Sequence, residues 1–143
     1  MMFQSRITMI TLGVADIAAS TAFYEKLGFR RSSASNDSVT FFHMKGTVLG
    51  LFGRDALAED AGLAPTARQP FEGMALAHNL GSPSEVDEAW EFTVGCGATP
   101  VKKPHAVFWG GYSGYFADPD GHLWELAHNP FADLGEDGHM MLP

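Results

Sequence analysis

The chain has 143 residues, of which 45% are hydrophobic and 18% are charged, and its formal net charge is −8 at pH 7. This length is about that of one domain, and the apolar content excludes a disordered chain. The negative charge repels nucleic-acid phosphates and anionic membranes, and no apolar run approaches the roughly 20 residues that span a bilayer. We therefore expect neither nucleic-acid nor membrane partners.

The number of cysteines and the first ten residues indicate the cellular compartment of the protein. Cys96 is the single cysteine, so the chain cannot form an intramolecular disulfide. Residues 1–10 lack the charged start and apolar core of a secretory signal. Both features predict a cytoplasmic protein.

Residues 7–14 are β-branched and apolar, which predicts the first strand. Side chains alternate between the two faces of a strand, so Met9 and Thr11 would lie on one face, and Leu12 and Val14 on the other. The helix that follows would cover the face of Leu12 and Val14.

Capping residues mark both ends of this helix. Asp16 is a good N-cap, and Gly28 follows the predicted last residue, Leu27, where a helix end favours a left-handed conformation. Spacings of three and four predict the buried stripe, which is apolar apart from one serine. It consists of Ile17, Ser20, Phe23, Tyr24 and Leu27.

The same order of elements is predicted twice along the chain. Strands follow the first helix at residues 30–33, 39–44 and 47–52, which completes a β-α-β-β-β unit over about residues 6–53. A connector follows over about residues 54–72, with a short helix near residues 55–61.

The second unit is predicted over about residues 73–130. Its helix begins at a capping box, residues 82–85, with proline at the first helical position, and ends near Cys96. Its strands are predicted at residues 74–80, 99–107, 111–117 and 122–127. We expect a single domain, residues 1–143, that ends in a tail at 131–143.

The last two predicted strands flank a turn, Asp-Pro-Asp-Gly, at residues 118–121. Proline fixes φ at the second position, the aspartates can bond their own backbone, and Gly121 accepts a positive φ. If the turn closes as a type I turn with a glycine bulge, Tyr115 lies beside Glu125. A slip of one residue would place Gly114 there instead.

This hairpin resembles one protein family. The run Asp-Pro-Asp-Gly-His-Leu-Trp-Glu-Leu, residues 118–126, is similar to the last two strands of the glyoxalase, bleomycin-resistance and extradiol-dioxygenase superfamily, also called vicinal oxygen chelate proteins. Residues 10–29 resemble the opening strand and helix of that family, and the resemblance spans about residues 6–130.

The resemblance implies an α+β fold. Two βαβββ units would form a curved, cup-shaped mixed sheet that holds a ligand on its concave face and carries the helices on its convex face. It also implies a homodimer, because the edges of such sheets are commonly paired between two chains of the family.

In the metalloenzymes of that family, the glutamate in the position of Glu125 is the final metal ligand. Matching the strand patterns of the two units places the other ligands at Met9, Gly50 and Ala75, or at Met74 if the match is one residue off. These residues do not suit Zn²⁺, Ni²⁺, Mn²⁺ or Fe²⁺, and one carboxylate cannot hold such an ion against water. We therefore expect no metal cofactor.

Two histidines bear on this expectation. His43 could reach the cup from the middle strands, where it would form a rearranged site with Glu125. His78 alternates with Leu76 and Leu80, which predicts a packed, hydrogen-bonded histidine on the helix-covered face.

Glu125 itself has two interpretations. It is either a relic that bonds a neighbour such as Tyr115, or a carboxylate in an apolar cup that acts as a base or holds a polar group of a ligand; desolvation would raise the pKa of such a carboxylate. An aromatic-rich cup suits a flat or apolar small molecule. The residues expected to bind it are Met9, Thr11, Phe52, Ala75, Trp109, Tyr115 and Glu125.

Two functions follow from the resemblance. The first is metal-free binding of a small molecule, as in the bleomycin-resistance members of the family. The alternative is an enzyme with an unusual site, either a metal-dependent lyase like lactoylglutathione lyase or an extradiol dioxygenase, in which Glu125 would be catalytic. Likeness of fold does not decide between them.

Overall fold

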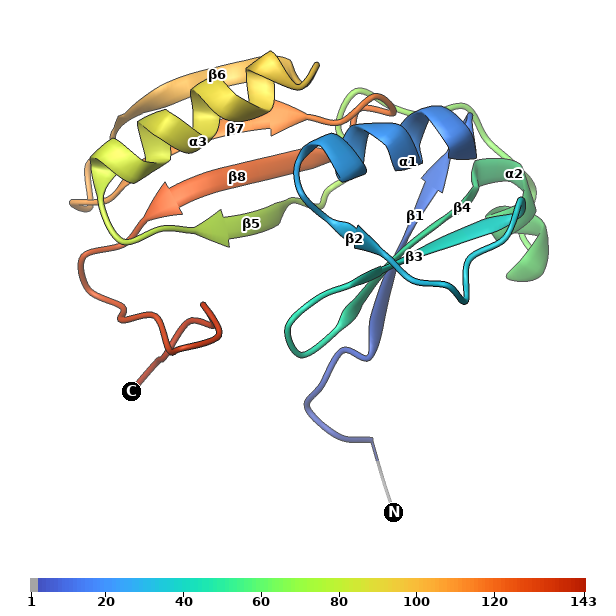
Figure 1. Cartoon of the computed structure of the whole chain (residues 1–143), viewed down its shortest axis with the longest axis horizontal. Helices are drawn as coiled ribbons and strands as arrows, with labels where there is room; N and C mark the ends of the chain where they lie inside the picture. The colour runs from blue at the N-terminus through green and yellow to red at the C-terminus, as the bar shows by residue number, and fades with distance from the viewer. Residues whose placement is uncertain (1–2) are drawn as a thin grey trace. The chain divides into compact units, whose positions relative to one another are not determined.

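The computed structural model describes residues 3–143, so the first two residues of the predicted domain lie outside the described part. The chain divides into two compact units, and the boundary falls between Ala67 and Arg68, inside the predicted connector. Figure 1 shows the helices and strands of both units. Each unit has a four-stranded mixed sheet with a long helix packed on one face. The predicted α+β class is confirmed, and neither sheet closes into a barrel within residues 3–143. That both units form one domain stays a prediction.

The first unit contains four strands and two helices. In chain order they are β1 (Met9–Val14), α1 (Ile17–Lys26), β2 (Arg30–Arg31), β3 (Val39–His43), β4 (Val48–Gly53) and α2 (Arg54–Asp60). The sheet order is β1-β4-β3-β2, in which β1 runs parallel to β4 and the other pairs are antiparallel.

The second unit repeats this topology. Its elements are β5 (Leu76–Asn79), α3 (Pro83–Gly95), β6 (Thr99–Ala106), β7 (Tyr112–Ala117) and β8 (Leu123–His128). The sheet order is β5-β8-β7-β6, again with the first and last strands of the unit parallel to each other. The predicted pair of βαβββ units is therefore confirmed, although β5 begins at Leu76, two residues later than predicted.

The caps of α1 fix its position on the first sheet. The Asp16 carboxylate accepts a hydrogen bond from the Ala19 N–H at 3.0 Å, and Gly28 follows the helix with φ 101°. The hydroxyl groups of Thr21 and Thr40 lie 2.8 Å apart and are buried, which fastens α1 to β3. The helix covers the face of Leu12 and Val14, as predicted, and both are 1% exposed.

The second helix, α3, is held in the same way. Ser82 accepts a hydrogen bond from the Glu85 N–H at 3.2 Å, and Val86, Trp90 and Thr93 form its buried side. In its second turn, Asp87 accepts a hydrogen bond from the Tyr112 hydroxyl at 2.7 Å, which joins α3 to β7. Of the helices within residues 3–143, none is long and apolar enough to cross a membrane.

The prediction of a packed His78 is wrong. His78 pairs with Leu126, so it shares the helix-covered face as expected, yet it is exposed. The reason is that β5 is an edge strand, while α3 packs mainly on β6, β7 and β8. Desolvation of the partly covered ring lowers the pKa of His78 below its ordinary value of 6.5.

Candidate functional site

The turn between β7 and β8 has the predicted hydrogen bonds. The Gly121 N–H donates to the Asp118 carbonyl at 2.9 Å, the Asp118 N–H donates to the His122 carbonyl at 3.0 Å, and Gly121 has φ 83°. Asp118 is 2% exposed, and its Oδ1 accepts from the N–H groups of Asp120 at 2.9 Å and His122 at 2.8 Å. One buried side chain therefore determines how the two strands meet.

This turn sets the register that brings Tyr115 beside Glu125. The two residues pair across β7 and β8, so the alternative register with Gly114 opposite Glu125 is excluded. The Tyr115 hydroxyl donates to Glu125 Oε2 at 3.1 Å. Desolvation, then the negative charge of Glu125 and the hydrogen bond to it, raise the pKa of Tyr115 above 10.0, so the phenol remains a donor at neutral pH.

The segment before β5 is tied to the same turn. The Arg68 guanidinium donates to the Gly121 carbonyl and forms an ion pair with Glu72 at 3.1 Å. The Glu72 carboxylate also accepts from the Gln69 N–H at 3.2 Å. No local pattern could have predicted the Arg68–Gly121 contact, because it joins residues 53 apart in the sequence.

This segment forms one wall of a shallow hollow of about 430 Å³. Its lining is mostly apolar, and its two residues with polar side-chain groups are Tyr115 and Lys102, which pair across β6 and β7. The residues that matter for its chemistry are Met74, Ala75, Val101, Lys102, Tyr115 and Leu123. A hollow of this size, apolar with a few polar groups, is typical of small-molecule sites.

The first sheet has the same register at the equivalent place. Gly50 on β4 lies between Thr11 on β1 and Phe41 on β3, as Glu125 on β8 lies between its partners on β5 and β7. The predicted match of Gly50 with Glu125 therefore agrees with the strand pairing. We call the face of each sheet opposite its long helix, α1 or α3, the open face; Gly50 and Glu125 both belong to it.

The residues at the positions matched to metal ligands can now be examined for side chains that could bind a metal ion. Met9 presents a thioether, whose sulfur lies 3.4 Å from where a Cβ of residue 50 would stand. Ala75 lines the hollow beside Tyr115, and Gly50 has no side chain. Among residues 3–143 no three His, Cys, Asp or Glu side chains are grouped so that they could hold a metal ion. This set of donors does not fit a hard or borderline divalent ion.

The remaining predicted residues are distributed as follows. His43 ends β3 opposite Val48, which places it on the open face of the first sheet, and a site combining it with Glu125 of the other unit stays a hypothesis. Phe52 lies two residues beyond Gly50 on the same face. Trp109 is 44% exposed in the loop before β7, where its ring lies against Gly111, and it is not among the residues that line the hollow.

Comparison with known proteins agrees with these features. The sequence model of the Glyoxalase/Bleomycin resistance protein/Dioxygenase superfamily matches residues 6–126. A structure of a glyoxalase-related enzyme from Fulvimarina pelagi is 37% identical in sequence, with 97% of this chain and 99% of that chain covered and a TM-score of 0.86. No curated protein matches the sequence.

Two further structures have named activities or roles. A lactoylglutathione lyase from Agrobacterium tumefaciens is 26% identical over 88% of this chain and 95% of that chain, with a TM-score of 0.67. A genomically encoded fosfomycin resistance protein from Listeria monocytogenes is 28% identical over 90% of this chain and 97% of that chain, with a TM-score of 0.67. Because the family model matches most of its length, the chain belongs to the glyoxalase/bleomycin resistance protein/dioxygenase superfamily.

Proposed function

We propose that this protein binds a small apolar or aromatic molecule without a metal, and that Tyr115 and Glu125 form the polar anchor of the site. The observation that carries this proposal is the hydrogen bond between these side chains beside a mostly apolar hollow. The other three positions matched to metal ligands, Met9, Gly50 and Ala75, supply no nitrogen or oxygen side chain.

The anchor favours ligands that carry a hydrogen-bond donor. A carboxylate has about four acceptor sites, and the Tyr115 hydroxyl uses one of them, so Glu125 can still accept an N–H or O–H group of a ligand. Tyr115 fixes the orientation of the carboxylate, while the apolar lining removes the ring or chain of the ligand from water. Thr11, Phe52 and Trp109 stay predicted contacts.

The alternative function is catalysis by a metal-dependent lyase of the lactoylglutathione lyase type or by an extradiol dioxygenase. The similarity to the lyase from Agrobacterium tumefaciens and to the glyoxalase-related enzyme from Fulvimarina pelagi favours it. In that case Glu125 would be a catalytic base or a ligand, and the remaining ligands to Zn²⁺, Ni²⁺, Mn²⁺ or Fe²⁺ would have to come from outside the four matched positions.

We also propose that the protein is a cytoplasmic homodimer. Each sheet has two edge strands, and the edge strand β6 contains Pro100 and Pro104 with Lys102 and Lys103 between them, residues that discourage pairing. The edge strands β1 and β5 contain neither proline nor lysine, which favours their pairing in the proposed dimer. Light scattering at micromolar concentration should give twice the chain mass of 15.4 kDa, and a monomer would contradict the proposal.

A ligand screen tests the binding function. We expect aromatic amines or phenols to raise the melting temperature of the wild type, because ligands that bind only the folded state stabilise it. Glu125→Gln should weaken binding about 10- to 100-fold, since it removes a charged hydrogen-bond acceptor. Glu88→Gln, on the exposed side of α3, is the matched control and should bind like the wild type. Equal binding by wild type and Glu125→Gln would contradict the proposed anchor.

A further inference from the structure

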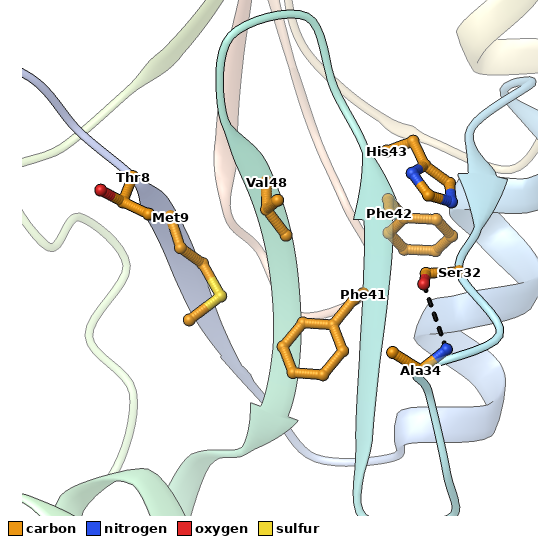
Figure 2. Close-up of a pocket in the computed structure, with 8 residues that line it drawn as sticks. All are labelled: Thr8, Met9, Ser32, Ala34, Phe41, Phe42, His43 and Val48. Carbon is orange, nitrogen blue, oxygen red and sulfur yellow. Dashed lines mark hydrogen bonds between the residues drawn. The ribbon is translucent and has the colours of Figure 1, made fainter.

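A second hollow, of about 310 Å³, lies on the open face of the first sheet. Figure 2 shows Met9 and Phe41 reaching toward β4 from its two sides, with Val48 on β4 itself. Ser32 and His43 stand on the other side of β3. Met9 is 45% exposed, although it is a large apolar side chain, so the floor of this hollow is open to a ligand.

The internal repeat relates this hollow to the one beside Tyr115. Counting from Gly50 and Glu125, Phe41 stands where the second unit has Tyr115, and Val48 where it has Leu123. Met9 matches Ala75 in the same way. The two hollows are therefore equivalent in position, but the first has a phenyl ring and a thioether in place of the phenol and the methyl group of the second. Beside them on the strands, Gly50 stands where the second unit has the carboxylate of Glu125.

We infer that the hollow of the first unit binds an uncharged aromatic ring carrying one hydrogen-bonding substituent. This inference deepens the proposed function, on which it rests, by naming a ligand class for the first unit. The Met9 sulfur favours contact with the edge of an aromatic ring, and Phe41 offers a second ring for an edge-to-face contact. A volume of about 310 Å³ is at the lower limit for ligand sites, which suits a small ring system.

The wall of the hollow is held in place before any ligand binds. The Ser32 N–H donates to the Phe41 carbonyl at 2.8 Å, and the Phe41 N–H donates to the Ser35 hydroxyl at 2.9 Å. The Ser32 hydroxyl accepts from the Ala34 N–H at 3.1 Å, as the dashed line in Figure 2 shows. The residues around Phe41 thus need little ordering on binding, which favours affinity.

In the proposed complex, the His43 imidazole, which lines the hollow beside β3, would hydrogen-bond the polar substituent. His43 is exposed at the end of β3, and its imidazole can donate or accept one hydrogen bond from a ring N–H or hydroxyl. The hollow contains no carboxylate or lysine among its lining residues. An uncharged ring with a single polar group, such as indole or 2-naphthol, matches this surface better than an ion.

The test maps indole and 2-naphthol onto the full chain by amide chemical shifts. We expect the largest shifts around Met9, Phe41 and Val48, and none with cyclohexanol, which has a similar polar group without an aromatic ring. Ala34→Trp fills the hollow from an exposed wall position and should abolish these shifts, whereas Ala22→Trp, exposed on α1, should not. Met9→Ala should weaken binding roughly 2- to 10-fold through loss of the sulfur–aromatic contact.

The same experiment separates this inference from the proposed function. Binding at Met9 and Phe41 should persist in Glu125→Gln, because the anchor belongs to the other unit. Shifts confined to the Tyr115 region would overturn the inference and leave the anchor standing. Changes around Met9 that depend on protein concentration without any probe would also overturn it, because a second copy of the chain would then cover the hollow.

Discussion

The two sheets have the same strand pairing, but they carry different side chains at equivalent positions. On β4 and β8 the same register places Gly50 beside Phe41 and Glu125 beside Tyr115. The first pair gives an apolar surface, and the second gives a carboxylate that holds a phenol at 3.1 Å. Repetition of the backbone therefore fixes the position of each pair of side chains, and the side chains decide whether the pair is apolar or polar.

The turns that lead into β4 and β8 show the same contrast. Gly46 and Gly121 occupy matching positions two residues before Val48 and Leu123, with φ 85° and 83°. Only the second turn begins with an aspartate, Asp118, whose carboxylate is buried and accepts two backbone N–H groups. The polar site thus has the more strongly specified turn.

The largest expected effect is from Asp118→Ala. It leaves the N–H groups of Asp120 and His122 without the carboxylate, which should cost about 3 kcal/mol of unfolding free energy. Both bonds are accepted by Oδ1, so Asp118→Asn, which keeps an oxygen at that position and loses only the charge, should lose less than half as much. Chemical denaturation measures both, and a loss below about 0.5 kcal/mol for Asp118→Ala, within the range of neutral surface changes, would refute this account of the turn.

Alanine at the two turn glycines should show unequal losses. Gly46→Ala meets no atom within 4 Å and should cost about 1 kcal/mol for the positive φ alone. Gly121→Ala would place its Cβ 2.8 Å from Arg68 Nε, so it should also disturb the bond of Arg68 to the turn and cost about 2 kcal/mol. In an Arg68→Ala background the two losses should become equal; a persistent difference would mean that Arg68 is not its cause.

Tyr115→Phe should have a smaller, pH-dependent effect. It removes one partly buried hydrogen bond, worth about 0.5–1 kcal/mol at neutral pH. Because folding raises the pKa of Tyr115 above 10.0, this residue adds stability below pH 10 and loses it as the pH rises through the raised pKa. Denaturation curves from neutral to strongly alkaline pH should therefore converge for wild type and variant, whereas a constant difference would contradict the raised pKa.

The reciprocal change, Phe41→Tyr, should have the smallest effect. Its hydroxyl would extend from a half-exposed ring toward a surface that has Gly50 in place of a carboxylate, so water would solvate it. We expect stability within about 0.5 kcal/mol of the wild type. A clear stabilisation by thermal melting would show that the first sheet contains an acceptor equivalent to Glu125.

Local sequence patterns predicted the features of the fold that short-range interactions determine. The caps at Asp16 and Ser82, the turn at residues 118–121 and the pairing of Tyr115 with Glu125 follow from short-range hydrogen bonds and strand alternation. These suffice for the topology of both units and for the equivalence of Gly50 and Glu125.

Contacts between distant segments were beyond such patterns. The predicted stripe of α1 omitted Thr21, whose partner Thr40 is 19 residues away, and nothing local links Arg68 to Gly121. His78 was expected to be covered because alternation gives the face of a residue but not the extent of the helix above it. The contact of Trp109 with a ligand was predicted from its aromatic character and stays a prediction; the residue lies in the loop before β7.

The most direct test of metal-free binding is elemental analysis of protein purified without chelators, combined with a lactoylglutathione lyase assay on the hemithioacetal, with and without added Zn²⁺, Ni²⁺ and Mn²⁺. We predict far less than one metal per chain and no turnover above background, because Glu125 alone cannot retain such an ion against water. About one metal per chain, lost together with turnover in Glu125→Gln, would contradict the proposed function and establish the enzyme.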